Sequence, residues 1–276
     1  MKKILVPTDF SKSADNAMNF ALELALRSGA AVHALHVIFP NEGVDNDIYS
    51  ALWIDEYYER RKHDLEKWAA RFRKKQAFKG LTITTSGEIG FPVSMIKKIV
   101  QDQNADLIVM GTTGATGLRG AVMGATASGV VSAVHTPVLA IPGKARFLRH
   151  ADYVLATDFD MRIDKDSVDV LKEILRIQDA GIHILHILNK PGEEPNKALE
   201  DKVKQLLTGT ACQFHYLHAA SVPGGINNFI ETIGANGLVV ISHHHSFLYK
   251  LIFQRVSRVL TEHVKVPILA LHDRGR

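Results

Sequence analysis

The sequence has little cysteine, few aromatic residues and no long hydrophobic run. Cys212 is the only cysteine among 276 residues, which excludes a disulfide within the chain. No apolar stretch approaches the roughly 20 residues that cross a bilayer. The start MKKILVPTDF, interrupted by Pro7 and Asp9, does not fit a signal peptide. We therefore expect a soluble, cytoplasmic protein without a membrane partner.

An excess of one charge is also lacking. The chain has 33 Lys and Arg against 29 Asp and Glu, a net charge of +4. The longest basic run, at 71–75, ends a segment that also carries several acidic residues, which is typical of the solvated face of a helix. A nucleic-acid surface needs a basic excess on one face and aromatic side chains on which bases stack, so we expect no nucleic-acid partner.

An internal repeat organises the chain. Four segments recur in the same order in the two halves of the sequence. The pairs are ILVPTDF (4–10) with VLATDF (154–159), AVHALHV (31–37) with GIHILHI (181–187), ADLIVMG (105–111) with NGLVVIS (236–242), and TPVLAIP (136–142) with VPILALH (266–272). We interpret the chain as two copies of one domain, residues 1–145 and 146–276, which pack on each other across a short polar joint.

Each copy alternates short apolar runs with stretches of helical period. In the first copy, the runs of strand length are 4–6, 31–38, 81–85, 107–110 and 138–141. Their near-continuous Ile, Leu and Val content is typical of strands buried on both faces of a parallel sheet covered by helices. A first helix is predicted over 11–28, with Ser11 as its N-cap and Gly29 as its stop, and apolar residues at 65, 68, 69 and 72 indicate a second. The sequence therefore predicts a doubly wound α/β fold in each copy.

Two loops are candidates for ligand binding. In doubly wound sheets, ligands bind beyond the carboxyl ends of the strands, where the strand order reverses. This rule selects the loop with Pro7, Thr8 and Asp9 and the stretch GTTGATGLRGAVMGATASG, which begins at Gly111 and leads into a helix. Such a glycine loop directs backbone N–H groups outward and lets a phosphate approach without Cβ clashes. It is neither a Walker A loop nor a GxGxxG motif, and its spacing alone fits a flexible surface loop equally well.

These motifs resemble those of the universal stress protein family. That family has a first strand ending in a PTD-like triplet and, later, Gly, two residues, Gly, nine residues, Gly and then Ser or Thr. Gly111, Gly114 and Gly124 have this spacing, and GFP at 90–92 is similar to the family's third crossover. The resemblance covers the chain as a tandem pair. It implies Rossmann-like domains of the adenine nucleotide alpha hydrolase-like type, each a five-stranded parallel sheet flanked by helices, with ATP binding and a dimer-like pairing of the two copies.

The resemblance also implies roles for the residues of the first loop. Carried over by position, Asp9 would accept hydrogen bonds from the ribose, and Pro7, Thr8 and Val37 would border the adenine. Met110 and Gly111 would lie beside the nucleoside. An acid placed before a helix that starts near Ser11 is also an ordinary structural feature, so this interpretation of Asp9 stays open.

For the phosphates, the resemblance implies Gly114, Gly124 and Thr126, with ATP bound alone or together with Mg²⁺. The sequence departs from the family at Ala125, where the family has Ser or Thr. The backbone N–H of Ala125 is still available for a phosphate, but a hydroxyl contact is lost unless Thr126 supplies it.

The second copy differs at the corresponding positions. It keeps the acid as Asp158, but Ala156 replaces the proline, and no glycine occurs between Ser242 and Val259. The residues that stand near the positions of 124–126 are Gln254, Arg255 and Val256. Because side chains would fill the space that a phosphate needs, we expect this copy not to bind ATP in the family's manner. It would serve as a partner domain or hold another ligand.

Histidines are concentrated in the second copy, which has 10 of the 14. The run His243, His244 and His245 suggests zinc, with help from His215, His218 or His272. Three consecutive histidines do not easily converge on one ion, so solvated loop histidines or anion contacts are the favoured interpretation and no metal site is predicted. The recurring pairs His33 with His36 and His183 with His186 fit a structural role in the second strand better than catalysis.

Three kinds of function stay open. The favoured one is a nucleotide-binding protein for stress response or signalling, with one ATP site in the first copy. The second is a weak ATPase or phosphotransfer enzyme, which is disfavoured because no catalytic base is evident and Arg119 is the only charged residue between Gly111 and Gly124. The third is a nucleotide-free structural or partner-binding module. We expect the two copies to form a pseudo-dimer within the chain, either alone or as part of a larger homodimer, because exposed strand edges favour association.

Overall fold

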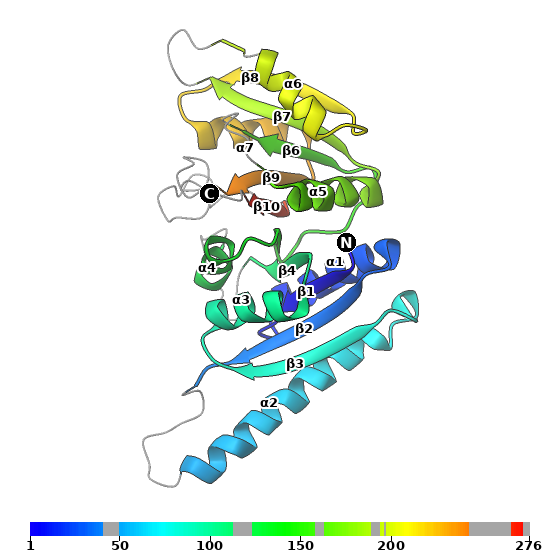
Figure 1. Cartoon of the computed structure of the whole chain (residues 1–276), viewed down its shortest axis with the longest axis vertical. Coiled ribbons are helices and arrows are strands. Elements are labelled where there is room, and N and C mark those ends of the chain that lie inside the picture. Colours follow the sequence, from blue (N-terminus) through cyan, green and yellow to red (C-terminus); the bar gives the residue numbers. More distant parts are fainter. Residues whose placement is uncertain are drawn as a thin grey trace.

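The fold is built on one continuous β-sheet that both halves of the chain share (Figure 1). The computed structural model of the chain describes residues 1–40, 50–112, 123–157, 163–188, 194–195, 197–242 and 266–272. Ten strands follow one another in the order β3-β2-β1-β4-β5-β10-β9-β6-β7-β8. From each outer edge inward, the order is therefore third, second, first, fourth and fifth strand of that half. The repeat in the sequence corresponds to a repeat in topology.

The elements of the N-terminal half alternate between strand and helix. They are β1 (Lys3–Pro7), α1 (Lys12–Ser28), β2 (Ala31–Ile38), α2 (Ser50–Arg73), the 3-10 helix η1 (Gln76–Phe78), β3 (Ile83–Ile89), α3 (Pro92–Gln103), β4 (Leu107–Gly111), α4 (Ala125–Ala133) and β5 (Val138–Ile141). Those described in the C-terminal half are β6 (Asp152–Ala156), α5 (Lys165–Gln178), β7 (Gly181–Leu188), α6 (Lys197–Leu206), β8 (Cys212–His218), α7 (Val222–Ile233), β9 (Gly237–Ser242) and β10 (Ile268–His272). Pairing within each half is parallel, as predicted for a doubly wound α/β fold.

The two halves join through their fifth strands. β10 pairs antiparallel with β5, with Leu269 opposite Leu139. Beside this seam, the Nε2 atom of His272, which is 4% exposed, lies 2.8 Å from the Val131 carbonyl oxygen of α4. Because a carbonyl only accepts, the imidazole donates, and it satisfies a carbonyl in the last turn of that helix. This pairing joins the strands of both halves into one sheet.

Helices cover both faces of the sheet. On one face, α1, α2, α5 and α6 enclose a core that includes Leu22, Trp68 and Ile174. On the other face, α3, α4 and α7 enclose a second core that includes Ile96, Val130 and Ile226. In doubly wound folds, ligands bind where successive helices change face, which here is at the carboxyl ends of β1 and β4.

Local signals in the sequence fix the ends of the first helix as predicted. The Ser11 side chain accepts a hydrogen bond from the Ala14 amide, and α1 stops at Gly29, which has a left-handed φ of 75°. A residue with a Cβ atom is strained in that conformation. The second predicted helix is also present, with Leu65, Trp68 and Phe72 buried on its inner face.

The third strand differs from the prediction in both position and burial. We predicted strand over 81–85 with both faces buried, whereas β3 spans Ile83–Ile89 and most of its residues are partly or fully exposed. It is an edge strand that pairs with β2 alone in this half, with Ile38 opposite Ile89. β3 pairs with β2 from Ile83 to Ile89, so the strand continues through polar residues. A search for apolar runs does not detect those residues as strand.

No helix in the described part of the chain is long and apolar enough to cross a bilayer.

Candidate functional site

The loop after β1 is a tightly bonded turn. Thr8 is buried, Asp9 is exposed, and Phe10 has a left-handed φ of 62°, which is uncommon for a residue with a side chain. The Thr8 Oγ1 atom accepts the Phe10 amide at 3.0 Å, and the Asp9 Oδ1 atom accepts the Ser11 amide at 3.0 Å. Asp9 therefore has the ordinary role of an acid before a helix, and the same turn holds its carboxylate at the carboxyl edge of the sheet.

The loop after β4 begins against the first turn of α1. A Cβ atom on Gly111 would lie 2.7 Å from Ser13 Oγ and 3.0 Å from the Ser13 carbonyl carbon. Because this approach is closer than real Cβ atoms show, glycine at 111 is required by packing as well as by any ligand. The next residue, Thr112, accepts the Gly124 amide on its carbonyl oxygen at 2.6 Å. The end of β4, the start of α1 and the start of α4 thus meet at one place.

The N-terminus of α4 faces this edge. Gly124 is the N-cap and makes no side-chain cap bond. The first backbone bond of the helix runs from the Ser128 amide to the Gly124 carbonyl at 3.0 Å. Helix geometry therefore leaves the amides of Ala125, Thr126 and Ala127 outside the intrahelical ladder. Such amides, together with the helix dipole, suit an anion.

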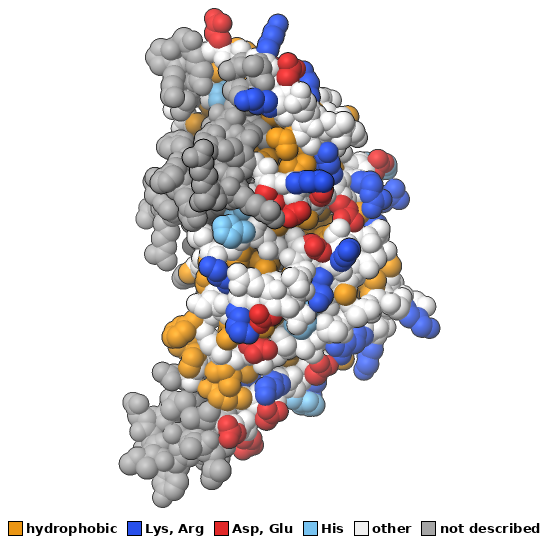
Figure 2. Space-filling view, viewed as in Figure 1, with side chains coloured by type: hydrophobic (Ala, Val, Ile, Leu, Met, Phe, Trp, Pro, Cys, Tyr) orange, Lys and Arg blue, Asp and Glu red, His pale blue; other side chains and the backbone are white. Residues whose placement is uncertain are grey.

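Val37 and Met110 lie on the face of the sheet that α3 and α4 cover. Met110 is part of the second core, and Val37 packs against it. Beyond Val37, hydrophobic side chains gather on the surface where β2, β3 and α3 meet (Figure 2), and the exposed ones there are Phe39, Ile89 and Phe91. The Phe39 and Phe91 rings meet edge to face, with centroids 5.2 Å apart.

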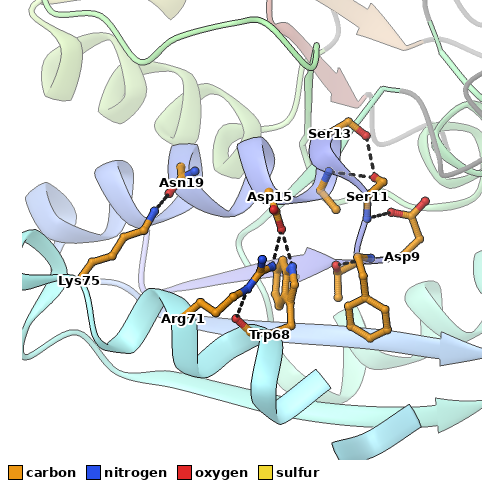
Figure 3. A network of polar contacts seen from close by, with 11 residues as sticks. Asp9, Ser11, Ser13, Asp15, Asn19, Trp68, Arg71 and Lys75 are labelled. Atoms are coloured by element: carbon orange, nitrogen blue, oxygen red, sulfur yellow. Dashed lines mark hydrogen bonds and ion pairs between the residues drawn. The ribbon is translucent and has the colours of Figure 1, made fainter. Parts of the chain in front are cut away.

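A polar network ties the start of α1 to α2 (Figure 3). The Asp15 Oδ1 atom accepts hydrogen bonds from Trp68 Nε1 at 2.6 Å and from Arg71 Nη2 at 2.9 Å. One turn further on, Lys75 donates to Asn19 at 2.7 Å. At the N-terminal end of the helix, the Ser11 and Ser13 hydroxyl oxygens lie 3.0 Å apart. These contacts tie the helix that follows the Asp9 turn to α2 and the segment after it.

Of the predicted site residues, the structure brings most to one edge of the sheet. Those at the carboxyl ends of β1 and β4 and at the start of α4 are Pro7, Thr8, Asp9, Met110, Gly111, Gly124, Ala125 and Thr126, and Val37 lies near the end of β2. Gly114 and Arg119 lie outside the described residues. So do Asp158, the run His243–His245 and the segment 254–256 of the C-terminal half. Within the described ranges, no three His, Cys, Asp or Glu side chains are grouped to hold a metal ion.

The first histidine of the recurring pair has different partners in the two halves. His183 Nδ1 lies 3.0 Å from His215 Nε2, whereas the corresponding His33 contacts the hydroxyls of Thr84 at 2.8 Å and Ser86 at 2.9 Å. Burial lowers the pKa of His215, and the neighbouring His183 lowers it further. Burial and then the Lys3 charge lower the pKa of His33. The lowered pKa values of His33 and His215 favour neutral imidazoles at these two positions within the strands.

A cavity of about 360 Å³ lies away from this site, between the amino ends of β4 and β5 and the first turn of α5. Acidic side chains that line it include Asp106, Asp164 and Asp166. Two of these already serve the fold, since Asp106 accepts the Lys3 amide at 2.9 Å and Asp164 caps α5 through the Ser167 amide at 3.0 Å. The chemistry of the carboxyl edge, rather than this cavity, identifies the candidate site.

Fold and site together define a class of protein. It is a doubly wound α/β protein in which a helix N-terminus suited to bind an anion lies at the same sheet edge as an aspartate turn. The sequence signature of the universal stress protein family matches residues 1–142, just over half of the chain. The chain therefore belongs to the universal stress protein family.

Individual relatives agree with this assignment. A universal stress protein of Methanocaldococcus jannaschii is 30% identical over 155 residues, which cover 52% of this chain and 96% of that protein. A second one from the same organism is 34% identical over 147 residues, 51% of this chain and 81% of its own length. The crystal structure of a universal stress protein from Archaeoglobus fulgidus covers 99% of this chain and 98% of that one, with a TM-score of 0.74 and 19% identity. This last likeness concerns the fold of both halves.

Sequence reasoning missed two neighbours of the site. Ser13 was seen only as part of a helix, although its contact with Gly111 joins the two loops. His36 was recognised as part of a recurring pair, but its bond to the Thr8 carbonyl oxygen, with Nδ1 at 2.8 Å, was not foreseen. The recurrence of His36 as His186 was the available signal.

Proposed function

We propose that this protein binds ATP at the carboxyl edge of its N-terminal half and acts in the cytoplasm as a nucleotide-dependent stress or signalling protein. The observation that carries the proposal is the convergence of the Asp9 turn, the end of β4 and the uncapped N-terminus of α4 within the segment that matches the family. An acceptor for a ribose and donors for phosphates are thereby offered on neighbouring elements.

The proposed contacts follow from the chemistry of each group. Asp9 is exposed and would accept hydrogen bonds from ribose hydroxyls. The amides of Ala125 and Thr126 would hold phosphate oxygens, with the hydroxyl of Thr126 beside them. Gly124 contributes a different property. Its own amide is committed to Thr112, so its value to a ligand is the absence of a side chain. ATP would enter alone or with Mg²⁺, whose ligands would come largely from the phosphates.

The C-terminal half has a different part in this proposal. We propose that residues 1–145 and 146–276 are two domains that form a pseudo-dimer within the chain, and that the second does not bind ATP in the family's manner. The support is the loss of every glycine between Ser242 and Val259. The expected stoichiometry is therefore one ATP for each chain.

The test is a direct binding measurement on the full chain. Nucleotide released from the purified protein is identified by mass spectrometry, and the stripped protein is titrated with ATP in a calorimeter, with and without Mg²⁺. We expect saturation at one ATP per chain. Two equivalent sites would contradict the division between the halves, and no uptake of ATP would remove the proposed function.

A variant pair locates the site. The double substitution Gly114→Val and Gly124→Val should abolish ATP binding, because side chains then occupy the phosphate path. Ala133→Val, at the last residue of α4, adds similar bulk to the same helix without touching its N-terminus and should bind ATP as the unchanged chain does. ATP binding retained in the double variant would exclude this loop as the site.

One specific residue favours the nucleotide-free alternative. Ala125 lacks the hydroxyl that the family has at this position, so the chain would be a structural module if that contact were essential. The same titration separates the two functions, and phosphate release measured from the ATP-bound chain tests the enzyme alternative.

A further inference from the structure

The imidazole of His36 contacts the residues on both sides of Asp9. Its Nδ1 atom lies 2.8 Å from the carbonyl oxygen of Thr8, which precedes Asp9. Its ring lies against the ring of Phe10, which follows Asp9, with centroids 4.4 Å apart and planes inclined by 36°. His36 is only 4% exposed and comes from β2, the strand beside β1. A buried group on a neighbouring strand thus supports the Asp9 turn from below.

The chemistry of this contact fixes the tautomer. A carbonyl oxygen only accepts hydrogen bonds, so Nδ1 of His36 carries a proton and donates it. Thr8 is held at its other end as well, because its amide donates to the Leu35 carbonyl at 2.8 Å. Both backbone polar groups of Thr8 are therefore bound by consecutive residues of β2. The direction in which the chain leaves β1 is set by these two bonds.

The turn that follows depends on that direction. Phe10 adopts its left-handed φ of 62° while its ring is enclosed by His36, by Trp68 at 6.2 Å between centroids and by the Arg61 guanidinium, whose Cζ lies 5.0 Å from the ring centroid. A non-glycine residue holds this conformation only where its surroundings enforce it. Asp9 lies between these two anchored residues and is exposed, so the backbone that carries its carboxylate is held in place.

We infer that His36 is a positioning residue of the nucleotide site, which orients the Asp9 carboxylate toward the ribose through its bond to Thr8 and its contact with Phe10. This inference rests on the proposed function for its ligand. It goes beyond that proposal by assigning a role in binding to a buried histidine that does not itself touch the nucleotide.

The C-terminal half contains a matched control. His186 Nδ1 lies 2.8 Å from the Thr157 carbonyl oxygen, and the Thr157 amide donates to the Leu185 carbonyl at 3.0 Å. The same bond at the same strand position therefore exists in the half that is proposed not to bind ATP. Removing either imidazole should cost similar stability, and only one removal should affect ATP.

The experiment compares His36→Leu, His36→Asn and His186→Leu in the full chain. Leucine removes the donor, whereas the asparagine side chain can place an amide N–H near the Nδ1 position. We expect His36→Leu to weaken ATP binding about tenfold in the calorimeter. His36→Asn should recover most of this affinity, and His186→Leu should bind ATP as the unchanged chain does, with a similar fall in melting temperature for both leucine variants. Equal effects of His36→Leu and His186→Leu on ATP affinity, or no effect of His36→Leu, would overturn the inference.

A second readout does not depend on ATP. Hydrogen exchange of the Phe10 and Ser11 amides, followed by NMR, should be faster in His36→Leu than in His36→Asn or the unchanged chain, because both amides donate within the Asp9 turn. If the unchanged chain takes up no ATP, the proposed function fails. The exchange rates then decide alone whether His36 holds the turn, and unchanged rates in His36→Leu would refute that role.

Discussion

The two halves of this chain have the same order of strands and differ in the sequence after the fourth strand and in one part of the core. Both hold the end of their first strand in the same way, through Thr8 with His36 in one half and Thr157 with His186 in the other. They differ at Gly111, which Ser242 replaces by position in the repeat, and at the glycines that follow it. The backbone bonds at the end of the first strand are retained, whereas the glycine-rich sequence after Gly111 is not.

The cores of the two halves also differ by one large side chain. Tyr153 occupies the position that corresponds to Ile4, and it is fully buried. Burial raises the pKa of its hydroxyl, which stays protonated and donates to Gln178 Oε1 at 2.6 Å. Gln178 in turn donates to the Leu148 carbonyl at 2.8 Å, in the joint between the halves. The tyrosine therefore links the core of the C-terminal half to the connecting segment.

The largest expected effect concerns the space that this tyrosine takes. A Cβ atom on Gly237 would lie 2.5 Å from Cδ1 of Tyr153 and closer still to Cε1. Gly237→Ala should therefore lower the free energy of unfolding by about 3 kcal/mol, as overpacking of a buried site does. Urea unfolding followed by circular dichroism measures this loss.

The control restores the residue of the other half. Tyr153→Ile removes the ring, so Gly237→Ala should cost far less in that background than alone. A cost below about 0.5 kcal/mol for Gly237→Ala in the unchanged background, the range of ordinary surface substitutions, would contradict this view of the core.

The next effect separates the aspartates that follow the first strand of each half in the sequence, Asp9 and Asp158. Asp9→Ala should weaken ATP binding by about 2 kcal/mol, roughly 30-fold, because a charged acceptor for the ribose is lost. Asp158→Ala should leave ATP affinity unchanged. Asp9→Asn keeps an oxygen for the Ser11 amide and should be intermediate. Titration calorimetry of the three variants measures these affinities. A strong effect of Asp158→Ala would show that ATP binding also depends on the C-terminal half.

A smaller effect should run in the opposite direction. Ala125→Ser adds at the start of α4 the hydroxyl that the resemblance predicts there, and a new hydrogen bond of about 1 kcal/mol would tighten ATP binding about fivefold. Ala133→Ser, at the end of the same helix, is the control and should have no effect. Unchanged affinity in Ala125→Ser would mean that Thr126 or the backbone already supplies the contact.

The smallest effect concerns acid stability. The pKa of His215 is lowered in the folded chain, so the unfolded chain binds a proton first as the pH falls through the ordinary value of 6.5. The folded state then binds fewer protons than the unfolded state, and its stability decreases with acidification. His215→Ser introduces the residue of the N-terminal half, Ser86, at this register position.

We expect the fall in melting temperature between about pH 7.5 and about pH 5.5 to be smaller in His215→Ser than in the unchanged chain. The part that His33 contributes should persist in both, since the pKa of His33 is lowered as well. The same fall in both proteins would show that the contact between His183 and His215 does not govern acid sensitivity.

Much of this architecture was predictable because it depends on local and repetitive signals. The ends of α1 follow from Ser11 and Gly29, and the buried strands follow from continuous apolar runs. The failure at β3 has a physical cause. An edge strand needs one partner and one covered face, so polar residues such as Thr84 and Ser86 are tolerated there and hide the strand from a pattern based on hydrophobicity.

The candidate site was predictable to a different extent. Asp9 was proposed from its place after the first strand, and Gly111 and Gly124 from their spacing, because glycine and acid positions are read directly from the sequence. The contact of Gly111 with Ser13 was not, because it joins the end of β4 to the first turn of α1, two elements far apart in the sequence. The support of the Asp9 turn by His36 was also hidden. It depends on the pairing of β2 with β1, which brings the His36 imidazole to the Thr8 carbonyl, and the sequence does not show this contact.

The antiparallel seam between β5 and β10 has a consequence for stoichiometry. Separate chains that met through such a seam would part on dilution, in proportion to their concentration. Here the two strands belong to one chain, and the connecting segment holds them at an effective concentration of about millimolar or above. Asn16 Nδ2 fastens that segment to α1 through the carbonyls of Pro142 and Ala145, each at 2.8 Å. Every molecule therefore carries one copy of each half at any dilution, so a change in one half is always combined with the unchanged other half.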